Sequence, residues 1–239
     1  MQEKIDQAVS QISRTIIGKQ QQIKLALSCM LANGHLLVED LPGMGKTTLS
    51  HALAQVFGLE FSRIQFTSDL LPADMLGLNI FDPNKQSFTF HPGPIFSQLV
   101  LADEINRASP KTQSALLEAM EEKQVSLDGT SHTLPSPFFV IGTQNPLHQS
   151  GTYPLPESQL DRFLMRIQLG YPDWQAEKQM LLEQDNDVTE TIQAVMTIEE
   201  FVAMQQQVKD IHVSDNILNY VLRLVTHSRE SEHFPNPLS

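Results

Sequence analysis

The apolar residues of this chain follow two periods, one typical of helices and one typical of buried strands. Near the N-terminus they recur at helical spacing over residues 3–17, and a second helical pattern covers about 20–33. Short apolar runs follow and predict strands at 35–39, 61–66, 98–102, 138–142 and 163–167. Helical patterns separate most of these runs, so the sequence predicts a parallel sheet covered by helices.

Two insertions interrupt this alternation. Residues 79–90 alternate around the turn Asp82–Lys85 and predict a hairpin. Residues 125–137 form the second insertion, which contains the turn Asp128-Gly129.

Strand signals stop at Tyr171-Pro172, and only helical patterns follow. We therefore predict an α/β domain at 1–170 and a small helical domain at 171–239, with Trp174 packing the helical part against the core.

The composition narrows the classes of protein to which this chain could belong. The formal net charge of −12 argues against broad nucleic-acid binding, which needs a basic surface. A single cysteine, Cys29, excludes an internal disulfide and fits a reducing cytoplasm. No apolar run is long enough to cross a membrane, and the eight histidines lack the spacing of metal ligands. We expect a cytoplasmic protein.

The segment Asp40–Thr48 carries the strongest chemical signal. It joins a predicted strand to a predicted helix and contains Gly43, Gly45, Lys46 and Thr47, as a phosphate-binding loop does. Backbone N–H groups and the helix dipole would bind phosphates there. The usual pattern has glycine at position 40, where this chain has aspartate, which tolerates left-handed backbone angles. The alternative is an ordinary turn with a chance Gly-Lys-Thr.

Three further polar groups follow predicted strands. Asp103 is placed to hold Mg²⁺ and Glu104 to activate water as a general base; a solvated acidic pair is the alternative. Asn145 could orient that water, although an asparagine before Pro146 also suits a plain turn. Arg162 could stabilise phosphoryl transfer, or pair at the surface with a nearby carboxylate.

These motifs, taken in order, resemble those of MoxR-type AAA+ ATPases over essentially the whole chain. The matching segments are Ile17–Lys19, Glu39–Thr47, Phe66–Pro72, Gly93–Phe96, Leu101–Arg107, Leu116–Glu122, Thr143–Pro146 and Leu155–Phe163.

The resemblance implies a P-loop NTPase fold, a three-layer α/β sandwich with a five-stranded parallel sheet, followed by an all-α lid. It implies ATP and Mg²⁺ as cofactors, with Thr47 and Asp103 at the metal. It makes Glu104 the catalytic base, Asn145 sensor 1 and Arg162 an arginine finger acting on a neighbouring subunit; Arg166, inside a strand pattern, is the weaker finger candidate. The implied cofactor-binding set is Ile17, Gly18, Pro42, Gly43, Met44, Gly45, Lys46, Thr47, Thr48 and Asp103.

By the same resemblance, ATP hydrolysis would drive chaperone-like remodelling or maturation of partner proteins, including metal insertion. The chain would form a ring with its own copies, expected to be a hexamer, beside a partner with a von Willebrand factor A domain. The two insertions would face the ring's centre. A nucleotide-dependent scaffold with negligible hydrolysis and a DNA-acting relative are the alternatives.

The sequence departs from the family pattern at its C-terminal end. Family members continue past the lid helix to a sensor 2 arginine, whereas this sequence stops at Ser239. We expect either a truncated lid or the absence of sensor 2.

Overall fold

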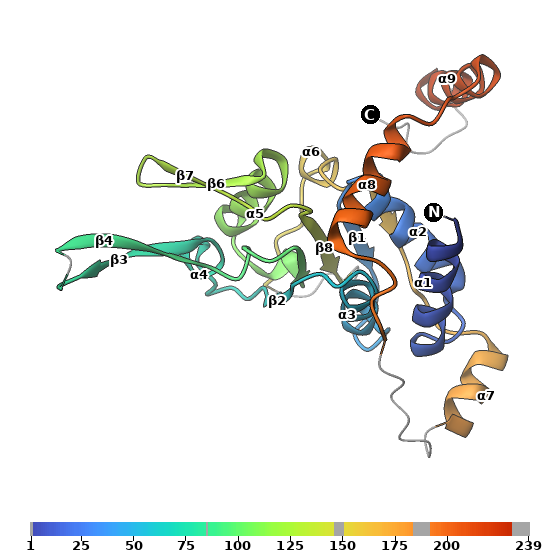
Figure 1. Cartoon of the computed structure of the whole chain (residues 1–239), viewed down its shortest axis with the longest axis horizontal. Helices are drawn as coiled ribbons and strands as arrows, with labels where there is room; N and C mark the ends of the chain where they lie inside the picture. The colour runs from blue at the N-terminus through green and yellow to red at the C-terminus, as the bar shows by residue number, and fades with distance from the viewer. Residues whose placement is uncertain (1, 85, 146–150, 184–191, 231–239) are drawn as a thin grey trace. The chain divides into compact units, whose positions relative to one another are not determined.

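A five-stranded parallel sheet forms the centre of the fold (Figure 1), in the order β2-β5-β8-β1-β9. The structure is a computed structural model that describes residues 2–84, 86–145, 151–183 and 192–230. The sheet strands are β1 (Leu36–Glu39), β2 (Phe61–Gln65), β5 (Leu99–Asp103), β8 (Phe139–Gln144) and β9 (Met165–Ile167). The predicted strands and the α/β fold class are confirmed.

Successive residues of the central strands point to opposite faces, and each face packs against its own helices. On β5, Leu99 and Leu101 belong to one apolar cluster, while Val100 and Ala102 belong to the other. The three layers that result are visible in Figure 1. The first face is covered by α1 (Gln2–Thr15), α2 (Gln20–Leu31) and α3 (Lys46–Val56), and the second by α5 (Pro110–Glu122).

Both predicted insertions are hairpins, and they contact each other. Asn79 donates a hydrogen bond to Asp128 at 2.7 Å, and the rings of Phe90 and His132 stack at 3.8 Å. Both hairpins project from the same side of the sheet (Figure 1). The first hairpin is β3 (Gly77–Asp82) with β4 (Ser87–Pro92), after the short helix α4 (Pro72–Leu76), and the second is β6 (Gln124–Leu127) with β7 (Thr130–Thr133).

After Pro172 the described residues contain helices and no strand, as the sequence predicts. These helices are α7 (Trp174–Glu183), α8 (Ile198–Lys209) and α9 (Asp215–Glu230). The prediction that Trp174 packs against the core is wrong, because this residue is 79% exposed. Across the described ranges, no helix is long and apolar enough to span a membrane.

The chain separates into two compact units, residues 1–205 and 206–239. The domain boundary that the sequence places near residue 170 stays a prediction. Lys85, Pro146 and the segment 231–239, where the sequence predicts a lid that ends before sensor 2, lie outside the described residues.

A buried histidine joins the sheet to α5. His35, just before β1, accepts the N–H of Val140 at its Nδ1 (3.0 Å), and its Nε2 lies 3.3 Å from the carbonyl of Met120. These two bonds fit a neutral ring with its proton on Nε2. Burial lowers the pKa of His35 from 6.5 to about 4, although the bond to Met120 opposes the shift.

Because of this histidine, we predict that the folded protein loses stability in acid. Below pH 6.5 the unfolded chain protonates His35, whereas the folded chain binds that proton only below about pH 4. Its contribution to the free energy of unfolding therefore falls as the pH drops from 6.5 to 4, by about 3 kcal/mol at most. Urea unfolding of the wild type and of His35→Gln should show a stability difference that shrinks through this window. A constant difference would contradict the account, and the exposed His91→Gln is the control.

Candidate active site

The loop between β1 and α3 has the backbone of a phosphate-binding loop. Gly43 and Gly45 have φ angles of +82° and +84°, and a Cβ added at either would meet nothing within 4 Å. Glycine is therefore required there by backbone conformation, and the hollow of the loop is open. Because α3 begins at Lys46, the first N–H groups of that helix are available to an anion.

The side chain of Lys46 bonds to the backbone at the start of its own loop. Its Nζ donates to the carbonyl of Asp40 at 2.8 Å. Burial lowers the pKa of this ammonium from its ordinary 10.5, and the carboxylates of Asp103, Asp40 and Glu104 oppose the shift. A cation that is partly desolvated beside an open loop attracts an anion strongly.

Asp103 ends β5 as a buried carboxylate with two protein partners. Its Oδ1 accepts the hydroxyl of Thr143 at 2.6 Å, and its Oδ2 accepts Nη2 and Nε of Arg63 at 2.6 and 3.2 Å. Neither partner was predicted as a site residue. Thr143 lies in the segment Thr143–Pro146 that the sequence already singles out, which is the signal that could have found it.

Glu104 follows in a left-handed backbone conformation, with φ of 59°. Its Oε2 accepts from Gln65 and from Arg107, each at 3.0 Å. Its own N–H donates to the hydroxyl of Thr143 at 2.9 Å. A non-glycine residue in this conformation is strained, and such strain is concentrated at functional sites. Arg107 belongs to the short helix η1 (Ile105–Arg107).

One cavity of about 580 Å³ brings the phosphate loop and the acidic pair together. The two motifs, which are far apart in the sequence, therefore line the same space. The lining residues are Pro42, Gly43, Gly45, Lys46, Thr47, Thr48, Arg63, Gln65, Thr67, Asp103, Glu104 and Arg107.

A second cavity, of about 310 Å³, shares Gly43, Gly45 and Thr48 with the first. Its lining includes the apolar side chains of Ile16, Ile17 and Met44. Predicted Gly18 does not line it, because that glycine packs against Ala176 of α7, where a Cβ would approach within 2.7 Å. The other lining residues are Thr15, Ile16, Ile17, Lys19, Met44, Gly170, Tyr171 and Pro172.

Asn145 and Arg162 line neither cavity. Asn145 directly follows β8, and its carbonyl accepts Nδ2 of Asn106 at 3.3 Å. Arg162, after the short helix α6 (Glu157–Leu160), forms an ion pair with Glu121 of α5.

The weaker finger candidate, Arg166, lies within β9 as its pattern predicts. Its Nε is 3.0 Å from Oε2 of Glu39.

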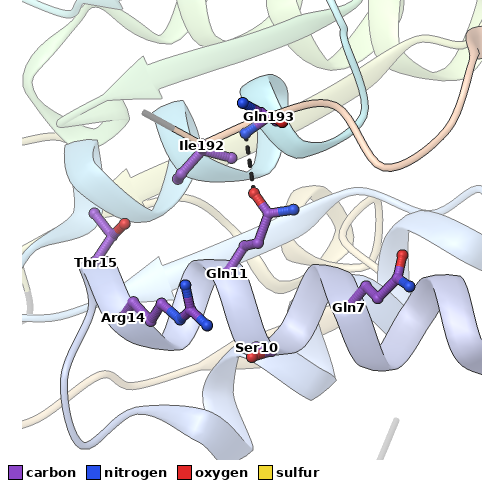
Figure 2. Close-up of a pocket in the computed structure, with 7 residues that line it drawn as sticks. All are labelled: Gln7, Ser10, Gln11, Arg14, Thr15, Ile192 and Gln193. Atoms are coloured by element: carbon purple, nitrogen blue, oxygen red, sulfur yellow. Dashed lines mark hydrogen bonds between the residues drawn. The ribbon is translucent and has the colours of Figure 1, made fainter. Parts of the chain in front are cut away.

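Another cavity lies between α1 and residues 192–193 (Figure 2), where the N–H of Gln193 donates to Gln11 at 2.9 Å. Its volume is about 610 Å³. It contains neither a phosphate-loop residue nor a carboxylate. Within the described part of the chain, no three His, Cys, Asp or Glu side chains cluster as metal ligands. Its lining residues are Gln7, Ser10, Gln11, Arg14, Thr15, Ile192 and Gln193.

A glycine-rich loop at a helix start, with an acidic pair at the end of β5 lining the same cavity, defines a P-loop nucleotide site. Residues 35–165 match the ATPase family associated with various cellular activities (AAA). Together with the relatives below, this match shows that the chain belongs to the MoxR-type AAA+ ATPases.

The similar proteins share nearly the whole of this chain. It is 47% identical over 227 residues to the uncharacterized protein YeaC of Bacillus subtilis, covering 95% of this chain and 71% of YeaC. It is 39% identical to the chaperone MoxR1 of Mycobacterium tuberculosis, with 95% and 60% covered. A crystal structure of a protein from Cytophaga hutchinsonii superposes with a TM-score of 0.85 at 38% identity, covering 95% of this chain and 69% of that one.

We predict that the two hydrogen bonds of the Thr143 hydroxyl stabilise the folded chain. In Thr143→Val the shape is kept, but a buried carboxylate oxygen of Asp103 and the N–H of Glu104 lose their partner. We expect the free energy of unfolding to fall by about 2 kcal/mol, measured by urea denaturation. The exposed Thr130→Val in β7 is the control; an equal effect at both positions would contradict this role.

Proposed function

We propose that this chain binds ATP with Mg²⁺ and hydrolyses it to ADP and phosphate. The observation that carries the proposal is the single cavity lined by Lys46, Thr47, Asp103 and Glu104. An open anion cradle and a buried carboxylate on one wall match the two charge types of a magnesium nucleotide.

The loop residues would bind the phosphates. The N–H groups from Gly43 to Thr48 would donate to the phosphates, with open space beside Gly43 and Gly45, and Lys46 would move from the carbonyl of Asp40 to the outer phosphates. The Thr47 hydroxyl and the Asp103 carboxylate would hold Mg²⁺. A cation fits beside Asp103, because a guanidinium already pairs with that carboxylate. When bound, the metal neutralises charge on the phosphate oxygens.

Glu104 would take the proton of the attacking water. In this structure Gln65 and Arg107 both donate to its carboxylate, so these bonds must rearrange before it can act as a base. Asn145, just past the neighbouring strand, would orient the water. Positioning and charge stabilisation would supply most of the rate enhancement.

Arg162 would act on the site of a neighbouring copy. It lines neither cavity of its own chain, and its side chain is 42% exposed. A closed ring, which we propose to be a hexamer, presents each such arginine to the next subunit.

For the biological role, we propose chaperone-like remodelling or maturation of a partner protein in the cytoplasm, including metal insertion. The support is the similarity to MoxR1, which is named a chaperone. A protein with a von Willebrand factor A domain is the proposed partner, and the paired hairpins would face the ring's centre.

A nucleotide-dependent scaffold is the second candidate function. The bonds that occupy the Glu104 carboxylate favour it, since a base held by two donors does not turn over ATP.

The Glu104→Gln variant separates these two functions. We expect its steady-state ATPase rate to fall at least about 100-fold, because the amide cannot accept the proton, while ATP binding remains. The exposed Glu118→Gln on α5 should retain the wild-type rate. Wild-type turnover at background level would favour the scaffold, and unchanged turnover in Glu104→Gln would remove the proposed base.

Mixing two inactive variants tests action between subunits. Arg162→Ala keeps an intact site and Glu104→Gln keeps an intact arginine, so random mixed rings contain some complete interfaces. We expect an equal mixture to recover about a quarter of the wild-type rate, because two independent choices must coincide at each interface. An arginine acting within its own chain gives no recovery at any ratio.

A further inference from the structure

Asp40 stands where the usual phosphate loop has glycine, and the structure shows a different use of this position. Asp40 is not among the residues with positive φ, so the left-handed conformation is not needed here. Its side chain is turned away from the solvent, with only 8% of the residue exposed. The departure from the usual pattern is therefore a buried carboxylate with a structural environment of its own.

The carboxylate of Asp40 binds the chain where it leaves the sheet. Its Oδ2 accepts the N–H of Leu169 and of Gly170, the latter at 2.8 Å, and its Oδ1 accepts the N–H of Leu41 at 3.3 Å. Since β9 ends at Ile167, the N–H groups of residues 169 and 170 have no place in the sheet ladder. The buried charge and these donors satisfy one another.

A second charged side chain holds the same short segment. Lys19, only 6% exposed, donates its Nζ to the carbonyl of Tyr171 at 2.7 Å. Gly170 turns the chain between these anchors with a φ of +64°. The residues Gly170, Tyr171 and Pro172 form one wall of the cavity beside the phosphate loop. Asp40 and Lys19 therefore both hold that wall, Asp40 through two backbone N–H groups and Lys19 through a backbone carbonyl.

Asp40 also touches the phosphate half of the site. Its carbonyl accepts Nζ of Lys46, the cation of the phosphate loop. One residue thus contacts Lys46 through its backbone and the wall of the neighbouring cavity through its side chain.

We propose that Asp40 is a positioning residue that sets the distance between the phosphate loop and the wall against which the base of the nucleotide binds. The inference rests on the proposed ATP binding at this site. The carboxylate holds the wall at residues 169–170, and Lys19 completes the hold at Tyr171. Asp40 therefore affects the affinity for the base of the nucleotide rather than the affinity for its phosphates.

The Asp40→Gly variant tests this directly, because it restores the usual phosphate-loop pattern while it removes the carboxylate. Two ligands are titrated calorimetrically: ATP, and inorganic tripolyphosphate, which has no base. We expect the Kd for ATP to rise about tenfold and the Kd for tripolyphosphate to change less than about twofold. Asp40→Asn keeps an oxygen acceptor and should recover part of the ATP affinity, and the exposed Asp210→Gly is the control.

Each outcome of these titrations either supports or overturns the positioning role of Asp40. Equal weakening of both ligands, or no weakening of either, overturns the positioning role while leaving ATP binding intact. If the wild type binds neither ligand, the proposed function fails and the inference falls with it. Should Asp40→Gly not fold, the ratio of the two affinities in Asp40→Asn replaces it: an unchanged ratio overturns the inference, and a selective loss for ATP supports it.

Discussion

The parallel pairing of β8 with both β1 and β5 is the constraint on which the site depends. In its register, Val38 lies beside Thr143 and Ala102 lies beside Gly142. Parallel strands end at a common edge, so the loop after β1 and the acid pair at the end of β5 come out on either side of β8. The hydroxyl of Thr143 then reaches Asp103 directly. A shift of one residue in this register would turn that hydroxyl to the opposite face.

The polar groups at this edge satisfy one another. Asp103 has a hydroxyl and a guanidinium as partners, Glu104 has an amide and a guanidinium, and Lys46 has a carbonyl. Buried charges are tolerated only when they are paired in this way. When a magnesium nucleotide binds, these charged side chains therefore exchange their present protein partners for groups of the ligand. The open hollow of the loop, where the two glycines leave room, is the part that needs no exchange.

The sequence predicted the sheet strands and the phosphate loop because both leave local signals, namely apolar runs and a glycine-rich turn. It did not predict Arg63 or Gln65, since their role depends on β2 lying next to β5 and on the direction in which strand side chains point. The partner of Arg162 was missed for a similar reason: Glu121 lies on a distant helix rather than nearby in the sequence. Asp40 was noticed only as a mismatch, because its partners at 169 and 170 are distant in the sequence and come close only through the pairing of β9 with β1.

A crystal structure of the chain with Mg²⁺ and a nonhydrolysable ATP analogue would show whether the nucleotide binds at the phosphate loop and displaces the present partners of Lys46 and Asp103. We expect the triphosphate to bind against the N–H groups of Gly43 to Thr48, with Lys46 moved from the carbonyl of Asp40 to a phosphate. We also expect Mg²⁺ to take the place of Arg63 beside Asp103. A nucleotide bound elsewhere, for example in the cavity of Figure 2, with the Lys46–Asp40 and Arg63–Asp103 contacts intact, would contradict both expectations.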